Sequence, residues 1–292
     1  MNLVVRPEVV PVPRAELGES PCWDARAGLL CWVDIPAGTI HRYDPADGSR
    51  DSIAVGQPVG AVAPRAAGGL VTAVRDGFAL CDPASRTFEL VARVEADRPG
   101  NRMNDGKCDP AGRFFAGTKA EDDTPGAGAL YRLDPDLAVT RVVGDVTISN
   151  GLDWSADGRL FYFIDSPTRR IDVFDRDPGT GEIAGRRSFV ELPVGAGWPD
   201  GLTVDAEGCV WVALWGGGAV RRYRPDGRLV HILRLPASRV TSCVFGGLDL
   251  DVLYVTTAAA EPGSALPAEP DAGSLFACRV GVVGRQAHAF AG

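Results

Sequence analysis

The sequence lacks the features that mark several common classes of protein. It has three histidines, its seven cysteines include no Cys-x-x-Cys pair, and nowhere do eighteen apolar residues run together. Disulfide frameworks, thiolate zinc sites and membrane-spanning helices are therefore not indicated. The net charge is −8 and the pI is near 5.0, so no broad basic field would draw the chain to nucleic acid or to an anionic membrane. We expect neither partner.

Sequence motifs for other common chemistries are also missing. No Gly-x-Ser-x-Gly nucleophile elbow occurs, and glycine-rich stretches such as residues 216–218 lack the Lys-Ser/Thr of a phosphate loop. We expect surface or packing roles for the histidines, and we expect the cysteines to fill small spaces in the core. The N-terminus carries no apolar segment of the kind that directs export. Scattered, reduced thiols then predict a cytoplasmic protein.

Glycine and proline, in contrast, are abundant. The 36 Gly and 22 Pro recur between short apolar runs, and no stretch shows a helical period over three turns. Six similar β-rich runs follow a glycine or its equivalent at Gly28, Gly69, Gly112, Gly158, Gly208 and Leu250. Second runs that often end in Asp-Pro follow several of them, which is typical of strands joined by tight turns.

The spacing of these runs predicts the fold. Their starts are separated by 41, 43, 46, 50 and 42 residues, close to the length of a four-stranded propeller blade. We therefore predict an all-β chain that forms one six-bladed β-propeller domain over residues 1–292, with a metal-binding central channel. The run 4–10 would supply the missing strand of the last blade and hide its edge. Twin β-sandwiches are the alternative, but they give no reason for six equivalent units.

One position in the repeat carries unusual residues. Eight or nine residues before each run, where an inner strand should begin, the occupants are Glu19, Gly60, Asn104, Asn150, Asp200 and Thr241. Equivalent inner positions of a propeller converge on the central channel. Oxygen donors without His or Cys suit a hard divalent cation such as Ca²⁺, Mg²⁺ or Mn²⁺.

An ordinary explanation exists for single members of this set. Asn150-Gly151 and Asp200-Gly201 are dipeptides that commonly form turns. Repetition at the same phase favours a site, because Glu19 is a poor turn residue and a buried carboxylate without a cation or donor is costly. Trp198 and Trp215 lie beside loops and are candidates to line a pocket there.

At these residues the chain resembles the senescence marker protein (regucalcin) and gluconolactonase-like family, essentially from end to end. The segments that carry the resemblance are Gly18-Glu-Ser-Pro, Trp32-Val-Asp-Ile-Pro, Asn101-Arg-Met-Asn-Asp-Gly-Lys-Cys-Asp-Pro-Ala-Gly-Arg-Phe-Phe-Ala-Gly-Thr, Ile148-Ser-Asn-Gly-Leu-Asp-Trp-Ser, Pro199-Asp-Gly-Leu and Thr241-Ser-Cys-Val-Phe-Gly-Gly. The resemblance implies a six-bladed propeller, one divalent ion (Ca²⁺, Zn²⁺, Mn²⁺, Mg²⁺ or Fe²⁺) and hydrolysis of a sugar lactone.

The resemblance also implies roles for particular residues. Glu19, Asn150 and Asp200 correspond to the metal ligands, in agreement with the repeat position. Arg102 and Asn104 match positions that contact substrate, and a further acidic contact falls on the pair Glu121-Asp122, with Asp122 as the aligned choice.

We expect Asp200 to serve also as the catalytic proton acceptor and donor in hydrolysis of an aldonolactone such as a gluconolactone or a pentonolactone. Three other functions stay open at this point. The protein could be a non-catalytic, cation-binding regulatory propeller, a metal-dependent esterase of other specificity, or a scaffold for protein interactions.

Overall fold

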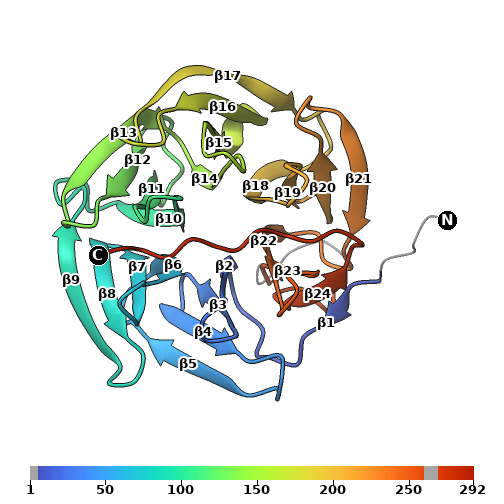
Figure 1. The fold of residues 1–292 in the computed structure, drawn as a ribbon, viewed down its shortest axis with the longest axis horizontal. Helices are drawn as coiled ribbons and strands as arrows, with labels where there is room; N and C mark the ends of the chain where they lie inside the picture. The colour runs from blue at the N-terminus through green and yellow to red at the C-terminus, as the bar shows by residue number, and fades with distance from the viewer. Residues whose placement is uncertain (1–5, 260–268) are drawn as a thin grey trace.

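The computed structural model describes residues 6–259 and 269–292. Within these residues, 24 strands form six four-stranded antiparallel sheets, which radiate around a central opening like the blades of a propeller (Figure 1). This architecture confirms the predicted six-bladed fold. The only helix among the described residues is a single 3₁₀ turn, η1 (Ser166–Thr168), and no described helix is long and apolar enough to cross a bilayer.

In each of the first five blades the chain runs from the innermost strand to the outermost. The first blade comprises β2 (Gly18–Asp24), β3 (Leu29–Asp34), β4 (Thr39–Tyr43) and β5 (Arg50–Ala54). The second comprises β6 (Val59–Pro64), β7 (Leu70–Val74), β8 (Gly77–Asp82) and β9 (Thr87–Arg93). The third comprises β10 (Asn101–Cys108), β11 (Phe114–Ala120), β12 (Gly128–Leu133) and β13 (Val139–Val146).

The remaining blades complete the circle. The fourth comprises β14 (Ser149–Trp154), β15 (Leu160–Asp165), β16 (Arg170–Arg176) and β17 (Ile183–Glu191). The fifth comprises β18 (Trp198–Val204), β19 (Val210–Trp215), β20 (Ala219–Tyr223) and β21 (Leu229–Arg234). The sixth comprises β22 (Val240–Gly246), β23 (Val252–Thr257), β24 (Phe276–Arg279) and β1 (Glu8–Val9).

The glycine-led runs of the sequence form the second strand of every blade, β3, β7, β11, β15, β19 and β23. Two of the Asp-Pro turns that follow third strands are closed by the side chain of the aspartate itself. Asp44 and Asp82 each accept a hydrogen bond at Oδ1 from the backbone N–H two residues later, at 2.8 Å. Such turns mimic a backbone turn and stop the strand.

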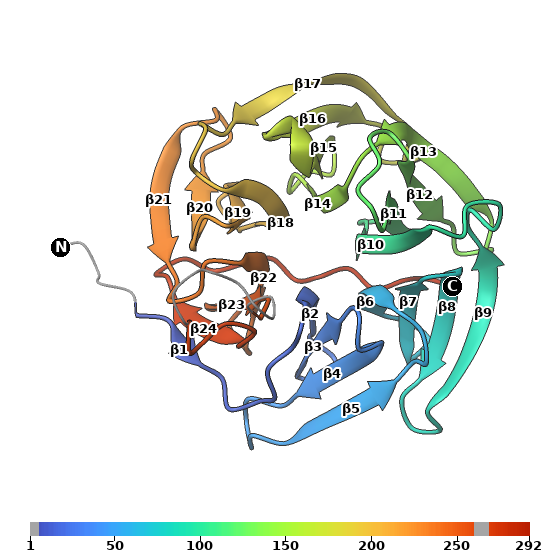
Figure 2. The same cartoon turned by 180° about the vertical axis from the view of Figure 1, so that it is seen from behind.

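Packing between neighbouring blades holds the propeller together. The inner strands β2, β6, β10, β14, β18 and β22 contact one another in a closed ring, visible from the opposite face in Figure 2. Large apolar side chains fill the spaces between sheets, as where Phe115 of the third blade lies edge-on to Trp154 of the fourth, 5.3 Å between ring centroids. Side chains on the outer strands alternate toward solvent, so each blade buries its apolar face against its neighbour.

The chain termini close the circle and cross it. Glu8 and Val9 pair with β24 as the outermost strand of the sixth blade, which confirms the predicted closure; residues 4 and 5 of that run lie outside the described residues. After β24 the C-terminal tail crosses the middle of the disc (Figures 1 and 2). Arg285 donates to the carbonyl of Trp154 (2.6 Å), at the end of an inner strand. The tail therefore closes the end of the channel where the inner strands finish.

Candidate metal and substrate site

All six inner strands are irregular at the same place. In each blade the pairing register between the first and second strands shifts at or directly after the position that the repeat singled out. Asn150 and Asp200 are unpaired within their shifts, and the shift in the first blade directly follows Glu19, which pairs with Val33. The corresponding shifts occur at Gly60, Asn104 and Thr241. A β-bulge of this kind leaves one residue out of the ladder and redirects its side chain. The bulge is therefore the local cause that turns Asn104, Asn150 and Asp200 toward the channel, and Glu19 is the last paired residue before the bulge of its own strand.

The structure also accounts for the Asn-Gly and Asp-Gly dipeptides. Asn150-Gly151 and Asp200-Gly201 lie inside β14 and β18, not in turns. A Cβ at Gly151 would lie 2.5 Å from the carbonyl oxygen of Asp200, and one at Gly201 would lie 2.0 Å from Ser242 Oγ. These glycines are required because the next blade approaches too closely for any side chain.

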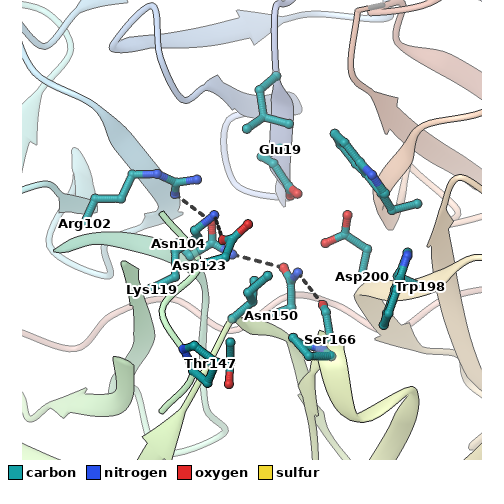
Figure 3. Close-up of a pocket in the computed structure, with 15 residues that line it drawn as sticks. Glu19, Arg102, Asn104, Lys119, Asp123, Thr147, Asn150, Ser166, Trp198 and Asp200 are labelled. Atoms are coloured by element: carbon teal, nitrogen blue, oxygen red, sulfur yellow. Dashed lines mark hydrogen bonds and ion pairs between the residues drawn. The ribbon is translucent and has the colours of Figure 1, made fainter. Parts of the chain in front are cut away.

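These side chains line a cavity of about 570 Å³ at the end of the channel where the inner strands begin. Figure 3 shows Glu19, Asn104, Asn150 and Asp200 pointing toward its centre from four different blades. The cavity is lined by Leu17, Glu19, Arg102, Asn104, Lys119, Asp123, Pro125, Thr147, Ile148, Asn150, Ser166, Pro167, Trp198, Asp200 and Trp215. No histidine or cysteine of the described residues lies in this lining.

Two carboxylates in the cavity are only partly balanced by nearby positive charge, because Arg102 and Lys119 lower their pKa values by less than burial raises them. Glu19 and Asp200 are each about 5% exposed. Burial, reinforced by the charge of Asp105, raises the pKa of Glu19 from 4.5 to about 8. Burial, with the charges of Glu19 and Asp105, holds the pKa of Asp200 well above its usual value. Asp200 Oδ1 has no hydrogen-bond partner among the described residues.

A divalent cation fits this group of oxygen atoms. Buried carboxylates that share one site either bind a proton or sit against a cation. Two carboxylates and the Asn150 amide oxygen form the kind of hard donor set that Ca²⁺ or Mg²⁺ prefers. The described residues contain no cluster of three or more His, Cys, Asp or Glu suited to a metal, which agrees with a third ligand that is an amide.

Hydrogen bonds fix the amides around the carboxylates. Asn150 donates from Nδ2 to Ser166 Oγ (2.9 Å), and Ser166 donates in turn to the carbonyl of Pro199 (2.7 Å). Asn104 Nδ2 donates to the carbonyl of Ser149 (2.8 Å) and to Asn150 Oδ1 (3.2 Å). The Asn150 oxygen is thereby directed into the cavity.

Arg102 belongs to the same network. Its guanidinium donates to Asn104 Oδ1 (2.7 Å) and to the carbonyl of Met103 (3.0 Å), and its Nε lies 3.4 Å from Glu121 Oε2. Because Asn104 accepts from Arg102 at Oδ1 and donates from Nδ2 to Ser149 and Asn150, its amide is held in one orientation at the cavity. Arg102 itself is buried, so its charge acts at short range on whatever fills the cavity.

The acidic pair after β11 divides between two environments. Glu121 lies between two arginines, because its Oε1 also accepts from Arg75 (2.7 Å). Asp122 is exposed, and its Oδ1 accepts hydrogen bonds from the Thr124 hydroxyl (2.7 Å) and from the Thr124 backbone N–H (3.0 Å). The next residue, Asp123, lines the cavity and forms an ion pair with Lys119. The structure thus places Asp123 in the cavity and directs Asp122 away from it.

Sequence reasoning identified neither Lys119 nor Asp123. One signal was available, because Lys107 and Lys119 are the only lysines in a chain with 30 basic residues. Both lie away from solvent: Lys119 in the cavity lining, and Lys107 paired with Asp153 at 3.0 Å. Trp198 and Trp215, anticipated at the site from their loops, both line the cavity.

Fold and site together define a class of protein, the six-bladed propellers with a buried acidic pocket at one end of the central channel. Comparison with known proteins is consistent with this class. Residues 17–259 match the family model described as SMP-30/Gluconolactonase/LRE-like region. Regucalcin of Oryctolagus cuniculus is 40% identical and regucalcin of Gallus gallus 41% identical, each alignment covering 99% of both chains. The chain therefore belongs to the SMP-30/gluconolactonase/LRE-like family.

Solved structures show the same fold. A calcium-binding protein, regucalcin, from Agrobacterium tumefaciens superposes with a TM-score of 0.93 at 32% identity, covering 98% of this chain and 97% of that one. A luciferin-regenerating enzyme superposes with a TM-score of 0.92 at 30% identity, covering 98% and 99%. A gluconolactonase from Xanthomonas campestris, at 22% identity and a TM-score of 0.76 over 95% and 90%, supports the fold alone.

Proposed function

We propose that this protein is a metal-dependent hydrolase that opens a sugar lactone to the corresponding aldonic acid. The observation that carries the proposal is the pair of buried carboxylates with raised pKa values, Glu19 and Asp200, in one cavity with the oriented amides and the buried Arg102. A cation site needs only the carboxylates. The adjoining donors and acceptors are what recognition of several sugar hydroxyls requires.

Glu19, Asn150 and Asp200 are the residues that would hold the cation. Once bound, a divalent cation supplies Lewis-acid polarisation of a carbonyl and a lowered pKa of bound water. The two carboxylates would then be ionised, because the cation replaces the protons that burial otherwise favours. The protein's contribution is to fix these oxygens on strands of three different blades before substrate arrives.

Asp200 is the residue that would move the proton. Its Oδ1 accepts no hydrogen bond within the described structure, so a lone pair is available to a water molecule in the cavity. We assign Asp200 the acceptance of a proton from the water that adds to the lactone carbonyl carbon. The same proton passes to the ring oxygen as the C–O bond breaks, and the product is a hydroxy acid.

Arg102, Asn104 and Glu121 would orient the ring. Arg102 offers donors at short range, and Asn104 presents an amide held on both sides. We propose Glu121 as the acidic contribution, acting through Arg102, since its carboxylate lies beside that guanidinium. Asp122 fits the role less well because its side chain is turned to Thr124.

Cation binding without turnover is the second candidate, since one structural relative is titled a calcium-binding protein. A pure cation site gives no reason for a buried Arg102 and Asn104 beside it. The seven cysteines are all free and buried, which supports a reducing compartment such as the cytoplasm.

The test is to strip the protein with chelator and follow acid release above the spontaneous rate. D-glucono-1,5-lactone and a pentonolactone are the substrates, and Ca²⁺, Mg²⁺, Mn²⁺, Zn²⁺ and Fe²⁺ are restored one at a time. We expect at least one ion to restore turnover, and Asp200→Asn to abolish it while the far-ultraviolet circular dichroism is unchanged. Asp157→Asn, at an exposed turn, is the matched control. Metal binding without any lactone or ester turnover would favour the second candidate.

A further inference from the structure

The cavity is larger than one sugar ring needs, and its lining is both polar and apolar. A hexonolactone takes up roughly 180 Å³, the space of about six water molecules, against a cavity of about 570 Å³. Its lining includes the carboxylates, the amides and Arg102, but also a group of large apolar side chains, of which Trp198 and Trp215 are the largest. The proposed hydrolysis of a simple polyol lactone makes no use of these two tryptophans.

The two tryptophans form one surface. Trp198 begins β18, Trp215 ends β19, and the two residues are directly paired across these antiparallel strands. Side chains of such a pair lie on the same face of a sheet, within contact of each other. Figure 3 shows Trp198 beside Asp200. We call this surface, Trp198 together with Trp215, the aromatic wall; it begins next to the proposed reactive centre.

The indole of Trp198 is held in place before any ligand arrives. The Arg169 guanidinium stacks over the ring, 3.9 Å from its centroid, and donates to the carbonyl of Gly197 (3.3 Å). Arg169 adopts the left-handed conformation, φ 57°, which disfavours a residue with a side chain. The Arg239 guanidinium lies 5.2 Å from the ring centroid of Trp215.

Trp198 is nevertheless 41% exposed. Tryptophan is highly buried on average, because its large apolar surface gains most from leaving water. Here that surface lines a cavity that also contains carboxylates and amides, and the Arg169 guanidinium stacks on the indole ring. A flat ring laid on the wall would bury the exposed indole surface.

We propose that the aromatic wall is a subsite for a second ring carried by the lactone, so that the preferred substrate is larger than a single aldonolactone. The proposal rests on the lactonase function proposed above. The ring needs a flat face of C–H groups or π electrons that packs on indole. A sugar ring and an aromatic ring both provide such a face, and the experiment distinguishes them.

The experiment compares three lactones on the metal-loaded protein: D-glucono-1,5-lactone, maltobiono-1,5-lactone, which adds a sugar ring, and dihydrocoumarin, which adds an aromatic ring. The readout is kcat/KM of each ringed lactone relative to that of gluconolactone. For Trp198→Ala we expect this ratio to fall about tenfold, equivalent to about 1.4 kcal/mol. Trp198→Phe keeps an aromatic face and should hold the ratio within about threefold of the wild type.

Binding without turnover is measured in parallel by titration calorimetry with maltobionate and gluconate, the acids that hydrolysis releases. We expect maltobionate to bind the wild type more tightly than gluconate does, and Trp198→Ala to remove the difference. This arm separates the two proposals. If no lactone is hydrolysed, the lactonase function fails, and calorimetry with maltobionate and with 3-(2-hydroxyphenyl)propionate, the acid formed from dihydrocoumarin, decides whether the wall binds a ring.

The outcomes are distinct. A fall confined to maltobionolactone identifies a sugar ring, and a fall confined to dihydrocoumarin identifies an aromatic ring. Equal ratios in wild type and Trp198→Ala for both ringed lactones, with equal binding of maltobionate and gluconate, would overturn the inference.

Discussion

The buried Glu19 carboxylate gives a quantitative prediction about the metal-free protein. Its pKa rises from 4.5 to about 8 because burial and the charge of Asp105 disfavour ionisation. At about 1.4 kcal/mol per pH unit, that difference corresponds to about 5 kcal/mol, a large share of the roughly 5–15 kcal/mol by which proteins of this kind are stable. Glu19→Gln keeps an acceptor for the N–H of Ser20, which Glu19 Oε2 now accepts at 2.9 Å, and removes the charge.

The sign follows from proton binding. The folded state binds the Glu19 proton more tightly than the unfolded chain does, so this stabilisation is fully present below pH 4.5. It is lost progressively as the pH rises from 4.5 to about 8. We therefore expect metal-free Glu19→Gln to match the wild type at low pH and to exceed its free energy of unfolding by up to about 5 kcal/mol at and above pH 8.

Urea unfolding in chelator, repeated from pH 4.5 to pH 8.5, measures this difference. Glu89→Gln, at an exposed position of β9, is the control and should follow the wild-type profile. Added Ca²⁺ at a hundred times its Kd should narrow this difference, because it stabilises the wild type by about 2.7 kcal/mol and binds less tightly to the variant, which has lost a charged donor. If Glu19→Gln is less stable than the wild type throughout, burial does not disfavour the Glu19 charge and the reasoning fails.

Three further predictions concern the cavity and the fold. Glu121→Gln should raise KM for lactone about fivefold in steady-state assays, whereas Asp122→Asn should change KM by less than about twofold. A larger effect of Asp122→Asn would show that Asp122, the residue chosen by alignment, is the acidic contact. Gly151→Ala forces a Cβ to 2.5 Å from the Asp200 carbonyl, so calorimetry should show metal affinity lower by about tenfold or more; unchanged affinity would mean that the blades tolerate the shift. Phe290→Ala, at a fully buried position of the tail, should cost about 3–5 kcal/mol in urea unfolding, and a loss below about 1 kcal/mol would show that the tail is not part of the core.

The fold could be predicted from the sequence because the residues that form its turns recur once in every blade. Glycines such as Gly28, Gly112 and Gly208 all have positive φ, and a residue with this backbone recurs once per blade just before the second strand. Local conformational demand therefore repeats at the spacing of the architecture. The short first strand, Glu8–Val9, was predicted on a different ground, the need to cover a blade edge.

The residues at the centre of the site could be predicted from the sequence for the same reason. The residues at its periphery could not. Glu19, Asn150 and Asp200 occupy one phase of the repeat, so comparing the blades with one another brings them together. Lys119 and Asp123 come from the end of β11 and the loop after it, for which no other blade offers an equivalent. Their meeting depends on the path of one loop, where Asp123 itself takes a positive φ of 58°. The repeat pattern of the sequence therefore does not predict the path of this loop.

At Asp122 the residue chosen by sequence alignment differs from the residue that the structure places at the cavity. Residue counting selects a position along the chain, whereas contact with a ligand depends on which way the backbone turns. A hydrogen bond from the Thr124 hydroxyl turns Asp122 away, the left-handed backbone of the next residue turns Asp123 inward, and Arg75 and Arg102 hold Glu121 between them. Three consecutive acidic residues thus receive three different environments. Because each environment is set by a neighbour outside the repeat, substitution of the three residues one at a time is the way to assign their roles.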